Sequence, residues 1–228
     1  VEFESQWMTG VSNEKGYLKR ACEASLKRLK REVIDLYQVH WPDEKTPVEE
    51  PIQALVELQK EGKIRFFGLS NFGIRDLETA LDVARYESLQ PQYSLLHREI
   101  EEEILPFCED NEIGILAYSP LACGLLTGKF TEDSVFPKGD HRGENPDFQG
   151  ETFLRNLRIV ELLKEYAEKQ ECTVTQLAIS WVLAHSGVTC AICGARRDMQ
   201  VDEIVEAIDY PLSEKQVLEI KALVEHCE

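Results

Sequence analysis

Short, nearly continuous apolar runs alternate along the chain with longer stretches in which apolar residues recur every three or four positions. The first pattern is typical of parallel strands covered on both faces, and the second is typical of amphipathic helices. Strands are therefore predicted at residues 33–39, 64–69, 88–90, 114–118 and 188–192. Helices are predicted at residues 14–29, 47–60, 74–84, 99–111, 152–169, 173–185, 198–208 and 213–226. This alternation predicts an α/β fold with a parallel sheet.

The segments between these elements differ in what they predict. Residues 1–11 carry no clear pattern, whereas Ser12 and Asn13 have side chains that commonly cap a following helix. Residues 131–150 are polar, contain Gly and Pro, and are long for a connection inside a compact domain. We expect this segment to be a lid or a loop that binds a ligand. Since no linker interrupts the pattern, residues 1–228 are expected to form one domain.

Five strands are compatible with two architectures. One is an open α/β sheet. The other is a (β/α)₈ barrel, which needs eight strands and would therefore lack its first units here. The hydrophobic pattern does not distinguish between the two.

The composition of the chain limits the kinds of partner that it can bind. Hydrophobic residues make up 43% and charged residues 29% of the chain, and no apolar run is long enough to span a membrane. The formal net charge of −17 repels nucleic acids and anionic lipids. The 7 cysteines are scattered. Cys190 stands in a predicted strand and Cys193 directly follows it, and residues three apart in extended chain point to opposite faces. We expect a cytoplasmic protein with reduced thiols, no nucleic-acid or membrane partner, and no metal.

Polar residues stand where the predicted strands end, namely His40, Ser70, Asn71, Gln90 and Tyr118. The carboxyl ends of parallel strands face the ligand crevice, so these side chains are candidates for a binding site. Structural roles are open alternatives for three of them. His40 would then be a satisfied structural histidine, Asn71 a turn or cap residue, and Tyr118 a core aromatic residue.

Two turns that contain glycine and lie next to cations are candidates for phosphate binding. One extends from Ser119 to Lys129, and the other places Arg196 and Arg197 after Gly194 and just before a helix. Neither matches a P-loop or a dinucleotide fingerprint, and each alone could be only a tight turn. Together, in so acidic a chain, the two guanidinium groups suit a phosphate monoester such as the 2′-phosphate of NADP.

Six motifs, in this order and spacing, resemble those of the aldo-keto reductase family. They are ACEASLKRL at 21–29, IDLYQVHWPD at 34–43, EGKIR at 61–65, GLSNF at 68–72, AYSPL at 117–121 and ICGAR at 192–196. Residues 121–129 with the long loop are most similar to the bacterial general-stress and inositol-operon branch. The resemblance implies a TIM (β/α)₈ barrel, here without about its first three βα units. It also implies NADP(H) as cofactor and the reduction of aldehydes or ketones to alcohols.

The resemblance implies four catalytic residues, of which one has a match. His40 would orient the substrate carbonyl, and Trp41 beside it would line the substrate mouth. The Tyr general acid and the Lys and Asp that tune its pKa would all precede Val1. Tyr17 and Tyr37 are poor substitutes, because one lies on a predicted helix and the other inside a predicted strand. We therefore expect impaired catalysis by this chain.

The resemblance also assigns the cofactor contacts. Ser70, Asn71 and Gln90 would bind the nicotinamide amide, and Tyr118 would stack on its ring. The residues along the pyrophosphate would be Ser119, Pro120, Leu121, Gly124 and Lys129. The residues at the adenosine end would be Gly194, Arg196, Gln200 and Glu203, with Arg196 facing the 2′-phosphate. Cys193 in place of the usual Pro, and Ile204 in place of an Asn that bonds adenine, depart from the family pattern.

The residues and the resemblance support three hypotheses about function to different degrees. The leading hypothesis is an NADPH-dependent reductase of small carbonyl substrates. The alternative is a non-catalytic NADP(H)-binding regulatory or interaction module on the same fold. A metal hydrolase using His40 and Asp43 has little support, because no further His or carboxylate ends a later strand. Self-association is expected through the open edges of the strands that end at His40 and Ile192.

Overall fold

The computed structural model describes residues 2–4 and 7–227. They fall into two compact units: residues 1–91 with 100–116, and residues 92–99 with 117–228. Each unit is described separately below. The expectation of one domain over residues 1–228 stays a prediction.

All five predicted strands are present. They are β3 (Ile34–Val39), β4 (Ile64–Ser70), β5 (Ser88–Gln90), β6 (Gly114–Tyr118) and β7 (Val188–Ile192). They form one sheet in the order β3-β4-β5-β6-β7, and the pairs from β3 through β6 are parallel. The predicted α/β class with a parallel sheet is therefore confirmed.

The helices follow the predicted periodicity with small differences at their ends. They are α1 (Lys15–Leu29), α2 (Glu49–Lys60), α3 (Ile74–Val83), α4 (Ile104–Asp110), α5 (Gly150–Lys169), α6 (Val174–Leu183), α7 (Asp198–Glu206) and α8 (Glu214–Glu225). The helix predicted at 99–111 is wrong in its first half, where a 3₁₀ turn at Glu99–Glu101 precedes α4. Pro106 has no amide hydrogen and its ring clashes with the carbonyl four residues earlier, so α4 can begin only just before it. No helix of the described residues has the length and apolarity needed to cross a membrane.

At the beginning of the chain the structure adds a hairpin that was not predicted and shows that one expectation is wrong. Where the sequence showed no pattern, β1 (Glu2–Glu4) and β2 (Trp7–Gly10) pair as antiparallel strands. Asn13 does not cap α1, because Glu14 occupies the cap position and offers no side-chain hydrogen bond. The buried Asn13 instead donates its amide to the Asp43 carboxylate at 2.9 Å and its side chain to the Trp41 carbonyl at 3.1 Å. Asn13 therefore fixes the loop that follows β3.

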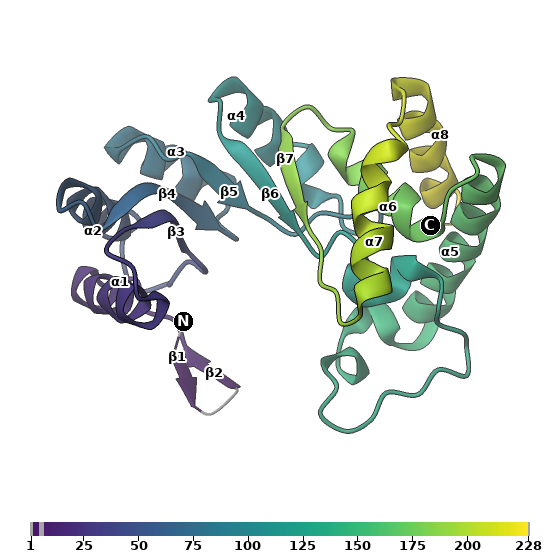
Figure 1. The fold of residues 1–228 in the computed structure, drawn as a ribbon, viewed down its shortest axis with the longest axis horizontal. Coiled ribbons are helices and arrows are strands. Elements are labelled where there is room, and N and C mark those ends of the chain that lie inside the picture. The colour runs from purple at the N-terminus through teal and green to yellow at the C-terminus, as the bar shows by residue number, and fades with distance from the viewer. Residues whose placement is uncertain (1, 5–6, 228) are drawn as a thin grey trace. The chain divides into compact units, whose positions relative to one another are not determined.

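The first unit has its core on one side of the sheet. Phe67 and Leu69 of β4 are fully buried, and α1, α2 and α3 lie along that side of strands β3 to β5 (Figure 1). The expectation that β3 is covered on both faces is wrong, since Leu36 and its register partner Phe66 are 37% and 51% exposed. Their side chains lie on the opposite side of the sheet from Phe67, because neighbouring residues of a strand alternate between faces.

The second unit is centred on α6. Every residue from Val174 to Val182 is buried, which is the pattern of a helix covered all round. Helix α6 packs against α5, α7 and β7 (Figure 1), and Thr173 caps its first turn in a capping box with Gln176. The fully buried Trp181 donates its ring N–H to the Val217 carbonyl of α8 at 3.4 Å. This rigid helix supports the ends of the neighbouring strands and turns, where the candidate site lies.

Candidate functional site

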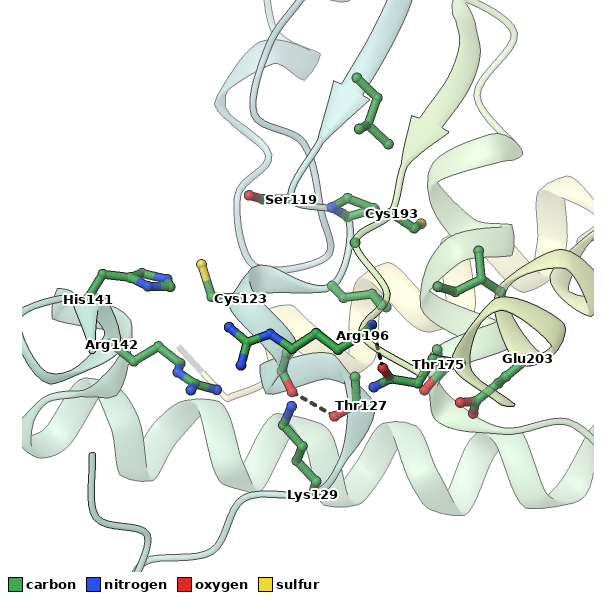
Figure 2. Close-up of a pocket in the computed structure, with 17 residues that line it drawn as sticks. Ser119, Cys123, Thr127, Lys129, His141, Arg142, Thr175, Cys193, Arg196 and Glu203 are labelled. Carbon is green, nitrogen blue, oxygen red and sulfur yellow. Dashed lines mark hydrogen bonds between the residues drawn. The ribbon is translucent and has the colours of Figure 1, made fainter. Parts of the chain in front are cut away.

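A cavity of about 300 Å³ opens within the second unit at the ends of β6 and β7. Its walls come from the turn after β6, the long loop, the start of α6, and the turn between β7 and α7 (Figure 2). Nine predicted cofactor residues line it: Ser119, Pro120, Leu121, Gly124, Lys129, Gly194, Arg196, Gln200 and Glu203. The structure thus brings the two predicted phosphate turns to one cavity, while the role of each residue stays a prediction.

The turn after β6 has an unusual backbone. Ser119, Ala122 and Cys123 have φ values of 54°, 45° and 54°, and Gly124 has 94°. A residue with a Cβ in this left-handed region costs about 1–2 kcal/mol, and such strain clusters at binding sites. The Thr127 hydroxyl donates to the Gly124 carbonyl at 2.8 Å and closes the turn. The strained turn therefore presents a fixed set of backbone groups to the cavity.

Gly124 also makes room for a cation. A Cβ at this position would lie 3.0 Å from Lys129 Nζ and 3.3 Å from Lys129 Cε. The lysine ammonium lies 4.9 Å from the centre of the Phe130 ring, within the range of a cation–π contact. The positive φ of Gly124 thus favours a residue without a side chain, and the Lys129 ammonium occupies the space that a Cβ there would crowd.

Three cationic groups converge in the cavity. Figure 2 shows the charged ends of Lys129, Arg142 and Arg196 turned toward one another. Desolvation lowers the pKa of Lys129, and the positive charges of Arg142, Arg196 and Arg197 lower it further. The repulsion between these like charges would be relieved by an anion, so the arrangement favours phosphate or a similar group.

Arg142 was missed by the sequence reasoning. Asp140 accepts from its backbone N–H at 3.1 Å and from its Nε at 2.9 Å, and its guanidinium lies 5.5 Å from the Phe130 ring centre and 5.3 Å from that of Phe136. The hydrogen bonds from Arg142 hold the pKa of the Asp140 carboxyl well below its usual range. The signal in the sequence was the pair His141-Arg142 in a loop expected to bind a ligand, and both residues line the cavity.

The start of α7 is held by Gln200. Its side-chain oxygen accepts from the backbone N–H groups of Arg196 and Arg197 at 2.9 and 3.1 Å. Gln200 therefore fixes the turn that carries Arg196, in addition to lining the cavity. Glu203 accepts from the Thr173 hydroxyl at 2.8 Å, and it lies with Thr175 away from the cations (Figure 2). The cavity thus has a cationic part and a part with neutral and acidic groups.

The two departures from the family pattern also line this cavity. Cys193 and Ile204 both contribute to its wall. Burial raises the pKa of the Cys193 thiol to about 11, so the group is a neutral, weakly polar part of the wall at neutral pH. All 7 cysteines are free thiols in the structure. No group of three or more His, Cys, Asp or Glu side chains suited to a metal occurs among the described residues.

The first unit gathers a second set of predicted residues. The Asn71 side chain donates to the His40 carbonyl at 2.9 Å and to the Ser70 hydroxyl at 3.0 Å, and that hydroxyl donates to the Gln90 carbonyl at 2.7 Å. Asn71 has a φ of 65°, the left-handed conformation that Asn tolerates better than most residues. The ends of β3, β4 and β5 are therefore linked by His40, Ser70, Asn71 and Gln90.

A further residue of this group, Gln38, was not predicted. Its side-chain oxygen accepts from Gln90 Nε2 at 2.9 Å, and its own Nε2 donates to the Ser88 hydroxyl at 3.1 Å. Gln38 lies beside Gly68 in the register, and a Cβ on Gly68 would come within 2.2 Å of the Ser88 hydroxyl and 3.2 Å of Gln38 Nε2. Because Gly68 of β4 has no side chain, the side chain of Gln38 can extend from β3 to β5.

His40 and Trp41 lie exposed just after β3. Their ring centroids are 6.2 Å apart, and desolvation is the main cause that lowers the pKa of His40. Desolvation also acts on Asp43, but the amide of Asn13, the hydroxyl of Thr46 and two further amides bond its carboxylate and lower its pKa to about 2. Asp43 is therefore a structural anchor of this loop.

Tyr118 is placed apart from the cavity wall. Its carbonyl accepts from the Tyr93 amide at 3.2 Å, its backbone pairs with Gln92, and burial raises the pKa of its phenol. The predicted stacking role of its ring stays a prediction. His40 and the predicted nicotinamide-amide residues Ser70, Asn71 and Gln90 lie in the first unit, whereas Tyr118 and the predicted phosphate residues lie in the second.

The fold and this arrangement define an α/β protein with a cavity at strand ends that is lined by three cationic side chains. The chain belongs to the aldo/keto reductase family, whose sequence profile matches residues 4–225. Among curated relatives, aldo-keto reductase YhdN of Bacillus subtilis is 40% identical over 205 residues, covering 90% of this chain and 62% of the relative. The NADH-specific methylglyoxal reductase of Escherichia coli is 35% identical over 214 residues, covering 92% of this chain and 65% of the relative. The chain thus spans somewhat less than two thirds of these relatives.

Solved structures of proteins from the same family also match this chain. The glycerol dehydrogenase AKR11B4 from Gluconobacter oxydans is 35% identical and superposes with a TM-score of 0.91, covering 99% of this chain and 69% of that one. An aldo/keto reductase from Klebsiella pneumoniae in complex with NADP and acetate is 30% identical with a TM-score of 0.71, covering 93% and 66%. The fold therefore matches part of a (β/α)₈ barrel of the aldo-keto reductase type, as the sequence motifs implied.

Proposed function

We propose that the protein is an NADP(H)-dependent oxidoreductase that reduces aldehydes or ketones to alcohols. The observation that supports this most strongly is the convergence of Lys129, Arg142 and Arg196 in one cavity of a chain with a net charge of −17. Repulsion between these like charges destabilises the protein unless an anion binds among them. A dinucleotide with a 2′-phosphate has negatively charged groups at two places, the pyrophosphate and the 2′-phosphate. A relative was solved with NADP, which agrees with this ligand class.

The residues present fit this cofactor by their chemistry. The three cations suit phosphate groups, the strained turn at 119–124 offers backbone groups, and Glu203 and Thr175 offer hydrogen bonds away from the charged part. A bound NADPH would supply the hydride for carbonyl reduction. In the first unit, Ser70, Asn71 and Gln90 would bind the nicotinamide amide, His40 would orient the carbonyl, and Trp41 would line the substrate mouth.

For the 228-residue chain we propose little or no turnover. Of the four catalytic residues that the resemblance implies, only His40 has a match here. Proton transfer by a positioned general acid contributes about 10²- to 10⁴-fold to rate, and the partners that tune its pKa would be missing as well. NADPH oxidation with an activated aldehyde, measured at 340 nm, should therefore stay near the background rate. A rate like that of an intact family member would contradict this proposal.

A non-catalytic NADP(H)-binding regulatory or interaction module is the second candidate. The observation that favours it is that the cavity of the second unit is formed, whereas only one of the four catalytic residues that the resemblance implies has a match in the chain. A titration that follows NADPH fluorescence tests what both candidates require, because absence of saturable binding would contradict both. Binding with turnover would contradict the non-catalytic module. If turnover is found, His40→Gln should lower it and His226→Gln should leave it unchanged.

The remaining proposals concern partners and location. A small carbonyl compound is the proposed substrate, and nucleic acids and membranes are not proposed as partners. Self-association is also proposed, because Leu36 on the edge strand β3 and Phe66 on the neighbouring strand β4 are both exposed. We expect mixed oligomers by light scattering, whereas a single monomeric species that melts cooperatively would contradict this. A cytoplasmic location is proposed from the free thiols.

A further inference from the structure

One wall of the cavity belongs to the long loop, and that stretch is tied to the rest of the second unit near its end. His141 and Arg142 line the cavity. The Asn145 amide donates to the Arg142 carbonyl at 3.3 Å, and the Asn145 side chain accepts from the Asp147 amide at 2.9 Å. Residues 140–148, here named the Arg142 segment, are thus a continuous set of turns from the cavity to Asp147.

Asp147 is held by His97. Its carboxylate lies 2.8 Å from His97 Nε2, and the two side chains are 17% and 21% exposed. The backbone of His97 is itself fixed, because its N–H and C=O both pair with Ser94, which is fully buried. The buried Asn156 of α5 donates to the Asp147 carbonyl at 3.0 Å. The imidazole is therefore a rigid point to which the Arg142 segment attaches.

The charged groups around His97 favour its protonated form. Asp147 faces it from the Arg142 segment, and Glu99, which is 79% exposed, lies 3.9 Å away on its own segment. The adjacent Arg98 is paired with Glu225 of α8 at 2.7 Å. The hydrogen bond to Asp147 is the main cause that raises the pKa of His97, against the opposing effect of burial.

We propose that His97 is a positioning residue for the cofactor, which holds the Arg142 segment against the cavity through Asp147 and does so more strongly when the imidazole is charged. This inference rests on the proposed function. It names a regulation of the same cavity, namely that affinity for the phosphate-bearing dinucleotide depends on the protonation of a residue outside the cavity lining.

The direction of the pH dependence follows from linkage. The pKa of His97 is raised when Asp147 is bound, and an imidazole released from that contact titrates near its usual value of about 6.5. The held segment is therefore fully favoured below about pH 6.5, and the advantage is lost as pH rises through the raised pKa. Cofactor affinity should fall over that interval.

The test measures NADPH dissociation constants from pH 5.5 to 9 for the unchanged chain and for His97→Gln, which keeps a neutral donor. The 2′-phosphate of the ligand also titrates near pH 6, but it does so equally in both proteins. We expect His97→Gln to bind about 3- to 10-fold more weakly at pH 6 and equally at pH 9. Curves that coincide, or that stay a constant factor apart at every pH, would overturn the proposal.

Two further variants isolate the residue. His226→Gln makes the same substitution at an exposed position just after α8 and should leave the curve unchanged. Asp147→Asn removes the partner charge and should reproduce the curve of His97→Gln. A normal curve for Asp147→Asn would overturn the proposal, because the mechanism requires both members of the pair.

A second measurement does not depend on the cofactor. Amide hydrogen exchange of residues 140–148 in the cofactor-free chain should be several-fold faster in His97→Gln than in the unchanged chain at pH 6, and equal at pH 8.5. Equal exchange at pH 6 would overturn the proposal even if NADPH does not bind. A different outcome is that His97→Gln exchanges faster at pH 6, as expected, but neither protein binds NADPH. That result would contradict the proposed function and would still support the role of His97 in holding the segment.

Discussion

The two groups of candidate residues differ in charge and in how their polar groups are satisfied. In the first unit, Ser70, Asn71, Gln90 and Gln38 are neutral, and they bond to one another and to the ends of the strands. In the second unit, Lys129, Arg142 and Arg196 carry like charges that converge. A network that satisfies itself is suited to orient a ligand, whereas a cluster of repelling charges is suited to attract one. From this difference we expect the cluster of the second unit to attract an anion, and the network of the first unit to orient a group by hydrogen bonds without net charge.

The largest expected effect is on the neutral network, through Gly68→Ala. The new Cβ would come within 2.2 Å of the Ser88 hydroxyl and 2.5 Å of the Ser88 carbonyl, and a backbone carbonyl cannot rotate away. We expect a loss of about 3 kcal/mol in the free energy of unfolding, at the upper end for overpacking. Gly73→Ala is the control, because a Cβ there meets nothing within 4 Å. Equal urea midpoints for the two variants would show that β4 and β5 are not held this closely.

Gly124→Ala tests the cationic cavity. The substitution strains a backbone with a φ of 94° and presses on Lys129, so we expect a loss of about 1–2 kcal/mol of stability and weaker NADPH binding. Gly139→Ala is matched to it, since its φ is 90° but a Cβ there meets nothing within 4 Å. Both variants should lose similar stability, and only Gly124→Ala should lose affinity. If Gly139→Ala weakens binding as much, the position of Lys129 does not matter.

Asp43→Asn has a smaller effect and tests the loop that carries His40. Desolvation opposes ionisation of Asp43, but four hydrogen bonds lower its pKa to about 2. Because this pKa is depressed, its contribution is present above the usual value and is lost as pH falls toward 2. We expect Asp43→Asn to lower the free energy of unfolding by about 1 kcal/mol at pH 7 and by about half as much near pH 3. Urea unfolding at both pH values measures it, and a difference that does not change with pH would contradict this role.

The sequence predicted the features that depend on local periodicity and on short motifs. The strands from β3 to β7 and most helices follow from apolar spacing. Lys129 and Arg196 were found because each stands in a recognisable turn next to glycine. The hairpin of β1 and β2 was missed because its strands are too short to show a period. The exposure of Leu36 was missed because an apolar run looks the same whether or not both faces are covered.

The features that could not be predicted depend on contacts between distant segments. Arg142 reaches the cavity from a long loop whose path is set by an aromatic group around Phe130, Phe136 and Phe148. Gln38 looked like an ordinary strand residue, and its reach to β5 depends on a glycine in the neighbouring strand. Asn13 was expected to cap the next helix, but its partners are about 30 residues away along the chain. Such pairings follow from the fold and have no local signal.

The cation cluster of the second unit is proposed to bind a dinucleotide through the 2′-phosphate of that ligand. The most direct test of this proposal compares NADPH and NADH binding by calorimetry in the unchanged chain, in Arg196→Gln and in Arg197→Gln. Arg197 is the control, because it adjoins Arg196 but does not line the cavity. We predict tighter binding of NADPH than of NADH, and about a 10- to 100-fold loss for NADPH alone in Arg196→Gln. Equal binding of the two cofactors, or equal losses in the two variants, would contradict the account.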